Sequence, residues 1–284
     1  MLFTFFFVGG VFLLGTVIGS FLNVVILRLG SGRSIVNDRS GCPSCGTTLA
    51  WYDLIPIASF VALRGRCRSC QSRIALQYPI VEMVTGGVFA FLAWRLAPVV
   101  LSGTSVAIQA GLDLVLLWVI TSFLVVLTVY DLRHMILPDS VTYLFIACAF
   151  IYAILPAVYA QTLFSGIFFD IAAGPLAAIP FLILWLVSGG KWMGLGDAKL
   201  VLGMGFLLGF TGVWAALLVA FWVGAIWGLT LIGMHRGKAL LGGRKGFTMK
   251  SEVPFGPFLV FGTAFVFLSG IDVLAWALSI GGML

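Results

Sequence analysis

Long apolar stretches separated by short polar segments dominate this sequence. Eight of them are candidate membrane spans, at residues 2–27, 79–97, 112–130, 140–160, 168–188, 198–211, 212–234 and 255–280. A helix needs roughly 20 apolar residues to cross the hydrocarbon core of a bilayer. Because backbone polar groups in lipid must find partners within the protein, such segments are helices. The pattern predicts an all-α polytopic membrane protein with about eight transmembrane helices, of which the sixth is short and rich in glycine.

The composition excludes a water-soluble globule. Of the 284 residues, 61% are apolar and 9% are charged, whereas soluble domains have roughly 45–50% and about 25%. The formal net charge of +6 would suggest nucleic-acid binding in a soluble protein. In a membrane protein it reflects the preference of basic residues for cytoplasmic loops, and we expect no nucleic-acid partner.

The distribution of basic residues predicts the orientation and the parts of the chain. All Lys and Arg residues except Arg95 lie in or directly beside alternate connections between the predicted spans. With eight crossings, the positive-inside rule places both termini outside the cytoplasm and these connections inside it. We expect a first transmembrane helix at 1–27, retained because it lacks the basic start of a signal peptide. A cytoplasmic loop at 28–78 and a seven-helix core at 79–284 follow.

Four of the five cysteines lie in this cytoplasmic loop as two pairs, Cys42/Cys45 and Cys67/Cys70. Two residues between paired cysteines allow one tight turn to direct both sulfurs at the same ion, and two such turns build a closed structural site with four thiolate ligands. A disulfide framework is the alternative, but cytoplasmic thiols are kept reduced. The spacing therefore predicts zinc or another thiolate-bound metal. Gln71 stands where a glycine often relaxes the second turn.

Two acidic residues mark candidate catalysis at the membrane edge. Asp131 ends the third predicted span and Asp197 opens the sixth, both on the predicted cytoplasmic side. Acidic groups at such positions are costly and are therefore functional candidates. Two adjacent carboxyl groups share one proton, so that one activates water while the other protonates the peptide, as in aspartic proteases. Gly194 and Gly196 remove side chains beside Asp197 and allow a substrate backbone to approach.

Other interpretations of these acids stay open at this level. Asp197 is also suited to cap a helix, and Asp139, which precedes Ser140, is a good N-cap. Asp131 can form a surface ion pair with Arg133. The same acids can serve as an ion relay in a transporter, or the chain can be a non-catalytic assembly protein whose zinc loop binds a partner. Glu82, near the start of the second span, is a further buried-acid candidate without an assigned role.

Several chemistries find no support. The chain has two histidines and no HExxH, which argues against a zinc protease of that class. No G-x-S-x-G elbow and no G-x-G-x-x-G after a strand occurs, so a serine triad and a dinucleotide site are unsupported. Three glycines, Gly203, Gly205 and Gly209, instead predict close packing between helices.

Six segments together resemble the type IV prepilin peptidase family of membrane aspartic proteases. They are GSFLNVVILR (19–28), LRGRCRSC (63–70), YPIVE (78–82), DLRHMILPD (131–139), GLGDAKL (194–200) and EVPFGP (252–257), with the paired cysteines between the first and third. The resemblance covers most of the chain, and the motifs occur in the family's order.

The resemblance implies a specific activity. Family members cut the short basic leader from prepilins of type IV pili and pseudopilins of type II secretion, at the cytoplasmic face of the bacterial inner membrane. Many then methylate the new N-terminus with S-adenosylmethionine, and members that lack the cysteine loop tend to lack methylation. The carried-over catalytic pair is Asp131 and Asp197, with Gly194, Gly196 and Lys199 as supporting residues of the same motif. The implied partners are prepilins or pseudopilins and the lipid bilayer.

Overall fold

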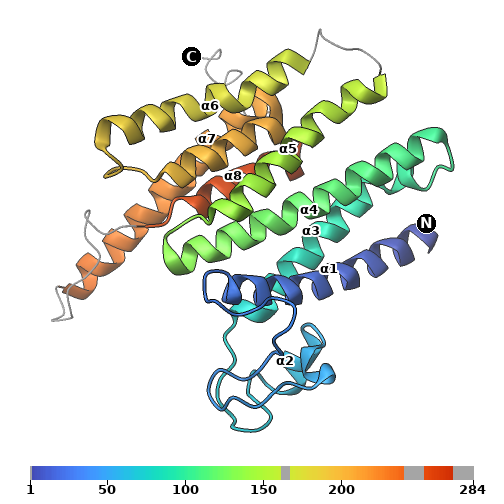
Figure 1. Cartoon of the computed structure of the whole chain (residues 1–284), viewed down its shortest axis with the longest axis vertical. Helices are drawn as coiled ribbons and strands as arrows, with labels where there is room; N and C mark the ends of the chain where they lie inside the picture. Colours follow the sequence, from blue (N-terminus) through green and yellow to red (C-terminus); the bar gives the residue numbers. More distant parts are fainter. Residues whose placement is uncertain (1, 161–166, 240–252, 271–284) are drawn as a thin grey trace. The chain divides into compact units, whose positions relative to one another are not determined.

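The computed structural model describes residues 2–160, 167–239 and 253–270 (Figure 1). Its elements are α1 (Leu2–Arg28), η1 (Trp51–Leu54), α2 (Ala58–Ala62), α3 (Gln77–Val100), α4 (Ser105–His134), α5 (Asp139–Ala160), α6 (Ile167–Ser188), α7 (Leu195–Ala239) and α8 (Gly256–Ser269). Over these residues the only strand-like pairing is two isolated bridges in the loop between α1 and α3. The predicted all-helical class is confirmed.

The predicted number of eight spans is not confirmed. Among the described residues six helices are long and apolar enough to cross a membrane: α1, α3, α4, α5, α6 and α7. The sixth and seventh predicted spans both lie within α7. The last predicted span, 255–280, is described only as far as Gly270, where α8 accounts for 14 residues. The remainder of that span lies outside the described residues.

Gly209 interrupts α7 close to 211/212, the predicted boundary between the two spans that this helix combines. Its backbone angles, φ 68° and ψ −175°, are not helical and lie in a region that is essentially restricted to glycine. The carboxylate of Asp170 in α6 lies against this point, because a Cβ at position 209 would come within 2.7 Å of Asp170 Oδ1. The interruption therefore depends on a residue without a side chain.

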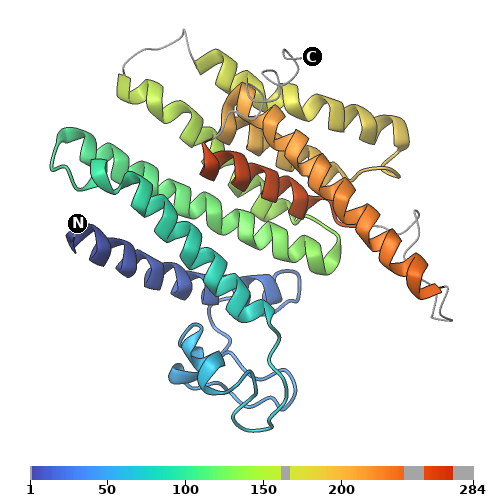
Figure 2. The same cartoon turned by 180° about the vertical axis from the view of Figure 1, so that it is seen from behind.

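The chain divides into two compact units, Met1–Val126 and Leu127–Leu284, and α4 runs through the division. In the first unit α1 packs along α3, and both views show the two helices side by side (Figures 1 and 2). The contact is made at small residues: a Cβ on Gly15 would lie 2.7 Å from Gly86 Cα, and one on Gly19 would lie 2.8 Å from Glu82 Cα. Such residues let helix backbones approach closely in lipid.

In the second unit α7 packs against α5, α6 and α8. Glycines again occupy the closest contacts. A Cβ on Gly205 would collide with the backbone of Gly174 in α6, and one on Gly203 would collide with the Phe145 ring of α5. These two positions confirm the predicted use of glycine for close packing. The start of α7, which carries Asp197, is thereby held against two neighbouring helices.

Neighbouring glycines in α3 provide a matched test of the α1–α3 contact. A side chain at Gly86 would meet Thr16 Cγ2 at 2.7 Å and the Phe12 carbonyl oxygen at 3.0 Å, whereas Gly87 has open space around it. We expect Gly86→Leu to lower stability by about 2 kcal/mol or more relative to Gly87→Leu, because overpacking forces the helices apart. Thermal unfolding of the two variants in detergent measures the difference. Equal unfolding temperatures would contradict the close packing.

Candidate active site and metal centre

The structure brings together the two acids that the sequence singles out. Asp131 lies three residues before the end of α4, and Asp197 is the third residue of α7. Both belong to the second unit. Asp131 is 5% exposed, and Leu137 lies against both Gly256, which contacts Asp131, and Gly196, which precedes Asp197. A pair of neighbouring carboxyl groups can share one proton, which is the arrangement that divides the roles of base and acid in aspartic proteases.

The N-terminus of α8 holds Asp131 in place. The Gly256 amide donates a hydrogen bond of 3.1 Å to Asp131 Oδ2. The first amides of a helix have no partner within the helix and carry a partial positive charge, so a carboxylate is favourable there. A Cβ at position 256 would come within 2.5 Å of the same oxygen. Sequence reasoning missed this residue, although its signal, a glycine between Pro254 and Pro257, is in EVPFGP.

The glycines around Asp197 have different roles. Gly194 lies next to the Asp197 carboxylate. A Cβ there would have only Asp197 Oδ2 and the Gly196 nitrogen within 4 Å, so the space beside the acid stays open. Gly196 instead accommodates Leu137, whose Cβ would lie 2.9 Å from an added Cβ. Leu137 also approaches Gly256. One buried side chain therefore lies beside both the glycine that precedes Asp197 and the glycine that contacts Asp131.

Lys199 and Asp139 meet one another next to this pair. Lys199 Nζ lies 2.6 Å from Asp139 Oδ1 and 4.9 Å from the centre of the Tyr143 ring. Asp139, which the sequence assigns to helix capping, is the first residue of α5. The ion pair therefore joins the start of α5 to the start of α7, although an exposed pair of this kind contributes only about 0–1 kcal/mol. The side chain of Lys199, the predicted supporting residue of GLGDAKL, is therefore directed toward α5.

The four cysteines of the first unit form a cluster that can hold a metal ion. The Sγ atoms of Cys42, Cys45, Cys67 and Cys70 all lie within 4.8 Å of one another, and those of Cys42 and Cys70 are 3.8 Å apart. A tetrahedral site with metal–sulfur bonds of about 2.3 Å has edges of about 3.8 Å. The four thiols are therefore close enough together to hold a thiolate-bound metal.

The two cysteine turns repeat the same backbone. In each, the amide after the second cysteine donates to the carbonyl of the first, from Gly46 to Cys42 and from Gln71 to Cys67. The donor residue has a positive φ in both turns, 72° at Gly46 and 59° at Gln71. Glycine adopts this conformation freely, whereas a residue with a Cβ is strained in it. The second turn thus carries a conformational cost that the first avoids.

Backbone amides prepare the first turn for metal binding. Hydrogen bonds from the amides of Cys45 and Ser44, with a further one from the Ser72 hydroxyl, lower the pKa of the Cys42 thiol to about 6. The thiolate is the form of cysteine that binds metals. At neutral pH the fold therefore favours the ligand form of this side chain.

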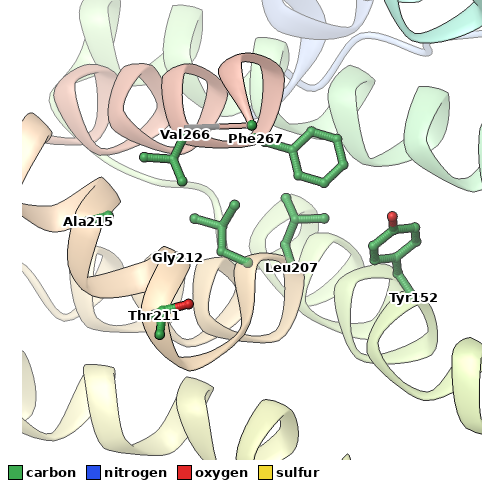
Figure 3. Close-up of a pocket in the computed structure, with 9 residues that line it drawn as sticks. Tyr152, Leu207, Thr211, Gly212, Ala215, Val266 and Phe267 are labelled. Carbon is green, nitrogen blue, oxygen red and sulfur yellow. The ribbon is translucent and has the colours of Figure 1, made fainter. Parts of the chain in front are cut away.

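A separate cavity of about 320 Å³ lies in the second unit between α5, α7 and α8 (Figure 3). Its lining includes Leu207 and Thr211 of α7, Val266 of α8 and Tyr152 of α5. Asp131 and Asp197 are not among the lining residues. Leu207 follows Asp197 by ten residues, which is about 15 Å along a helix. The cavity is therefore distinct from the site of the two acids.

The fold and these residues define a class of protein. It is a polytopic membrane protein in which two acids from distant helices meet at helix ends, accompanied by a loop with a four-cysteine cluster. Two family models match the chain: one for the bacterial peptidase A24 N-terminal domain, over residues 13–96, and one for the type IV leader peptidase family, over residues 118–229. The chain belongs to the type IV leader peptidase family, a family of proteases, and is an enzyme.

Curated relatives extend this similarity over most of the chain. A protein of Aeromonas hydrophila named prepilin leader peptidase/N-methyltransferase is 33% identical over 303 residues, covering 95% of this chain and 93% of its own. Proteins of the same name from Bacillus subtilis (30% identical, 93% and 95% covered) and Myxococcus xanthus (37% identical, 78% and 62% covered) are also similar. No solved structure matches the chain significantly.

The strained second turn yields a prediction for metal retention. Replacing Gln71 by glycine removes a Cβ from a left-handed conformation, which we expect to stabilise the loop by about 1 kcal/mol. Because metal binding and folding of such a loop are coupled, that gain corresponds to roughly fivefold tighter metal binding. Titration of metal release with a chelator measures the effect. Gln71→Ala keeps the Cβ and is the matched control, and equal metal retention in the two variants would contradict the role of strain.

Proposed function

We propose that this protein removes the basic leader of type IV prepilins or pseudopilins by an aspartic-protease mechanism, with Asp131 and Asp197 as the catalytic pair. The observation that carries the proposal is the meeting of these two acids, one near the end of α4 and the other at the start of α7, beside the N-terminus of α8. The names of the relatives support the choice of substrate.

The geometry supports a division of roles between the acids. In this mechanism one carboxylate withdraws a proton from the attacking water while the other, protonated, donates to the peptide. The hydrogen bond from Gly256 to Oδ2 orients the carboxyl group of Asp131. Asp197 borders the open space at Gly194, through which the extended leader would reach the pair.

The position of the acids along their helices suits a membrane-bound substrate. Both lie within three residues of a helix end, at the edge of the apolar segments Val106–His134 and Leu195–Gly233. A prepilin consists of a basic leader followed by an apolar helix, so its scissile bond lies at the membrane surface. The clustering of basic residues in alternate loops supports a cytoplasmic orientation of this surface in the bacterial inner membrane, with both termini outside.

The cysteine cluster and the name of the relatives support two cofactors. Zinc is the metal that best matches four thiolates in a closed tetrahedral arrangement, and its role in such a site is structural. S-adenosylmethionine would supply the methyl group for the new N-terminus of the cleaved substrate. The cysteine loop distinguishes the methylating members that the sequence resembles, which supports a bifunctional enzyme.

Replacement of either acid tests the proposal. We expect Asp131→Asn and Asp197→Asn to lower the rate of leader removal by about a thousandfold or more, since neither amide can exchange the required proton. Purified protein in detergent is incubated with a prepilin, and mass spectrometry measures the loss of the leader. A further gain of about 14 mass units that needs S-adenosylmethionine reports methylation.

Asp38→Asn provides the matched control, because Asp38 is an exposed acid of the loop. It should cleave at the rate of the unmodified protein. Near-normal cleavage by Asp197→Asn would refute the paired mechanism, and ion flux across sealed vesicles without cleavage would identify a transporter.

The contact between Gly256 and Asp131 predicts a second loss of activity. In Gly256→Ala the new methyl group occupies space within 2.5 Å of Asp131 Oδ2, so the carboxyl group must move. A misplacement of this kind lowers rates by about a hundredfold. Gly228→Ala is the control, because nothing lies within 4 Å of an added Cβ there. The same prepilin assay compares them, and similar rates for both variants would show that the contact is dispensable.

A further inference from the structure

A segment between the two cysteine turns exposes apolar side chains without packing any of them in a core. It comprises η1 and α2, residues 51–62, and we call it the η1–α2 segment. Neither helix contains a buried residue. Trp51 is 77% exposed and Val61 is 67% exposed, and Leu54 and Ile55 are also exposed. A water-facing loop rarely leaves so much apolar surface uncovered, so such a patch indicates a binding surface.

A hydrogen bond places this segment at the depth of the lipid headgroups. The Ile57 amide donates to Glu82 Oε2 at 2.8 Å, and Glu82 is 7% exposed in the second turn of α3. The 24 residues of α3 extend over about 36 Å, which exceeds a hydrocarbon core of about 30 Å. The excess of about 6 Å is about one helical turn, so the first turn of α3 reaches the interfacial layer. Ile57 lies beside Glu82, directly after that turn.

The backbone conformation of Ile57 indicates that the surrounding structure holds the η1–α2 segment against α3. Ile57 has φ 60° and ψ −50°, which is a genuine outlier for a β-branched residue. Strained residues persist where the surrounding structure holds them, and they mark functional contacts. Here the strained residue is the one whose amide reaches Glu82. The contact also gives a role to the buried acid that the sequence left unassigned.

The charges around the segment complement an anionic surface. Arg64 and Arg66 directly follow α2 and are exposed. Arg68 donates to Asp53 at 2.9 Å and lies 5.0 Å from the centre of the Tyr52 ring, so a further guanidinium is held against η1. Tryptophan and tyrosine are enriched at membrane interfaces, and arginines beside them bind anionic lipid headgroups.

We propose that the η1–α2 segment is a membrane-surface anchor, which inserts its exposed apolar side chains at the acyl boundary and binds anionic phospholipid headgroups through Arg64 and Arg66. The occupant is lipid rather than a protein partner because α1 and α3 tether the loop to the bilayer at both ends (Figures 1 and 2). The Glu82 contact then holds the segment at headgroup depth. The anchor fixes the cysteine loop to the membrane independently of the metal.

Photo-cross-linking in a bilayer tests the anchor. The photoreactive residue p-benzoylphenylalanine replaces Trp51 in the full-length protein, which is reconstituted in nanodiscs of phosphatidylcholine with or without phosphatidylglycerol. After illumination, mass spectrometry of the peptide that contains position 51 identifies what was captured. We expect a phospholipid adduct, about fivefold more abundant in the anionic membrane. The same residue at Ser44, an exposed position of the first cysteine turn, should capture severalfold less lipid.

A second variant separates the anchor from general damage to the loop. Glu82→Gln retains the side-chain shape but weakens the bond to Ile57, and it should lower lipid capture at position 51 severalfold while the metal content stays unchanged. Capture of another part of this chain, of a second copy, or of lipid equally at positions 51 and 44 would overturn the proposal. So would lipid capture that is unaffected by Glu82→Gln or by the anionic lipid.

Discussion

The hydrogen bond from the Gly256 amide to Asp131 is the interaction on which the candidate site depends. It joins residues 125 positions apart and brings the start of α8 against the end of α4, while the charge of Asp131 also acts on Asp197 in α7. A glycine is required because any side chain would occupy the position of the carboxylate oxygen. A main-chain amide therefore positions one of the two acids, which distinguishes this site from a cluster of acids on a protein surface.

Glycine allows close helix packing in both units of the molecule. Gly86 in the first unit and Gly205 in the second allow helix backbones to meet where a Cβ would collide. In lipid, where burial of apolar surface gives helices no reason to associate, close van der Waals packing at small residues supplies the attraction. The contact of Gly205 with α6 and that of Gly203 with α5 hold the first part of α7, which carries Asp197.

The sequence predicted what is local and periodic. It predicted the all-helical class, because apolar runs determine membrane helices, and the Cys42–Cys70 quartet, because the spacing of each pair limits where the sulfurs can point. The predicted number of about eight spans is not confirmed, because α7 contains the sixth and seventh predicted spans and the last one is described only as far as Gly270. The sequence did not predict the hydrogen bonds from Gly256 to Asp131 and from Ile57 to Glu82. In each, a main-chain amide donates to an acid far away in the sequence, and no pattern of side chains identifies that partner. The predicted division at 27/28 and 78/79 stays a prediction.

The interruption at Gly209 has a mechanical consequence. The part of α7 before it, residues 195–208, extends over about 21 Å, less than the thickness of the hydrocarbon core. Asp197 therefore lies on a short helical segment that ends inside the bilayer, and one non-helical residue joins this segment to the remainder of the helix. A bend in the part of α7 after Gly209 is therefore not passed on through a continuous helix to the part that carries Asp197.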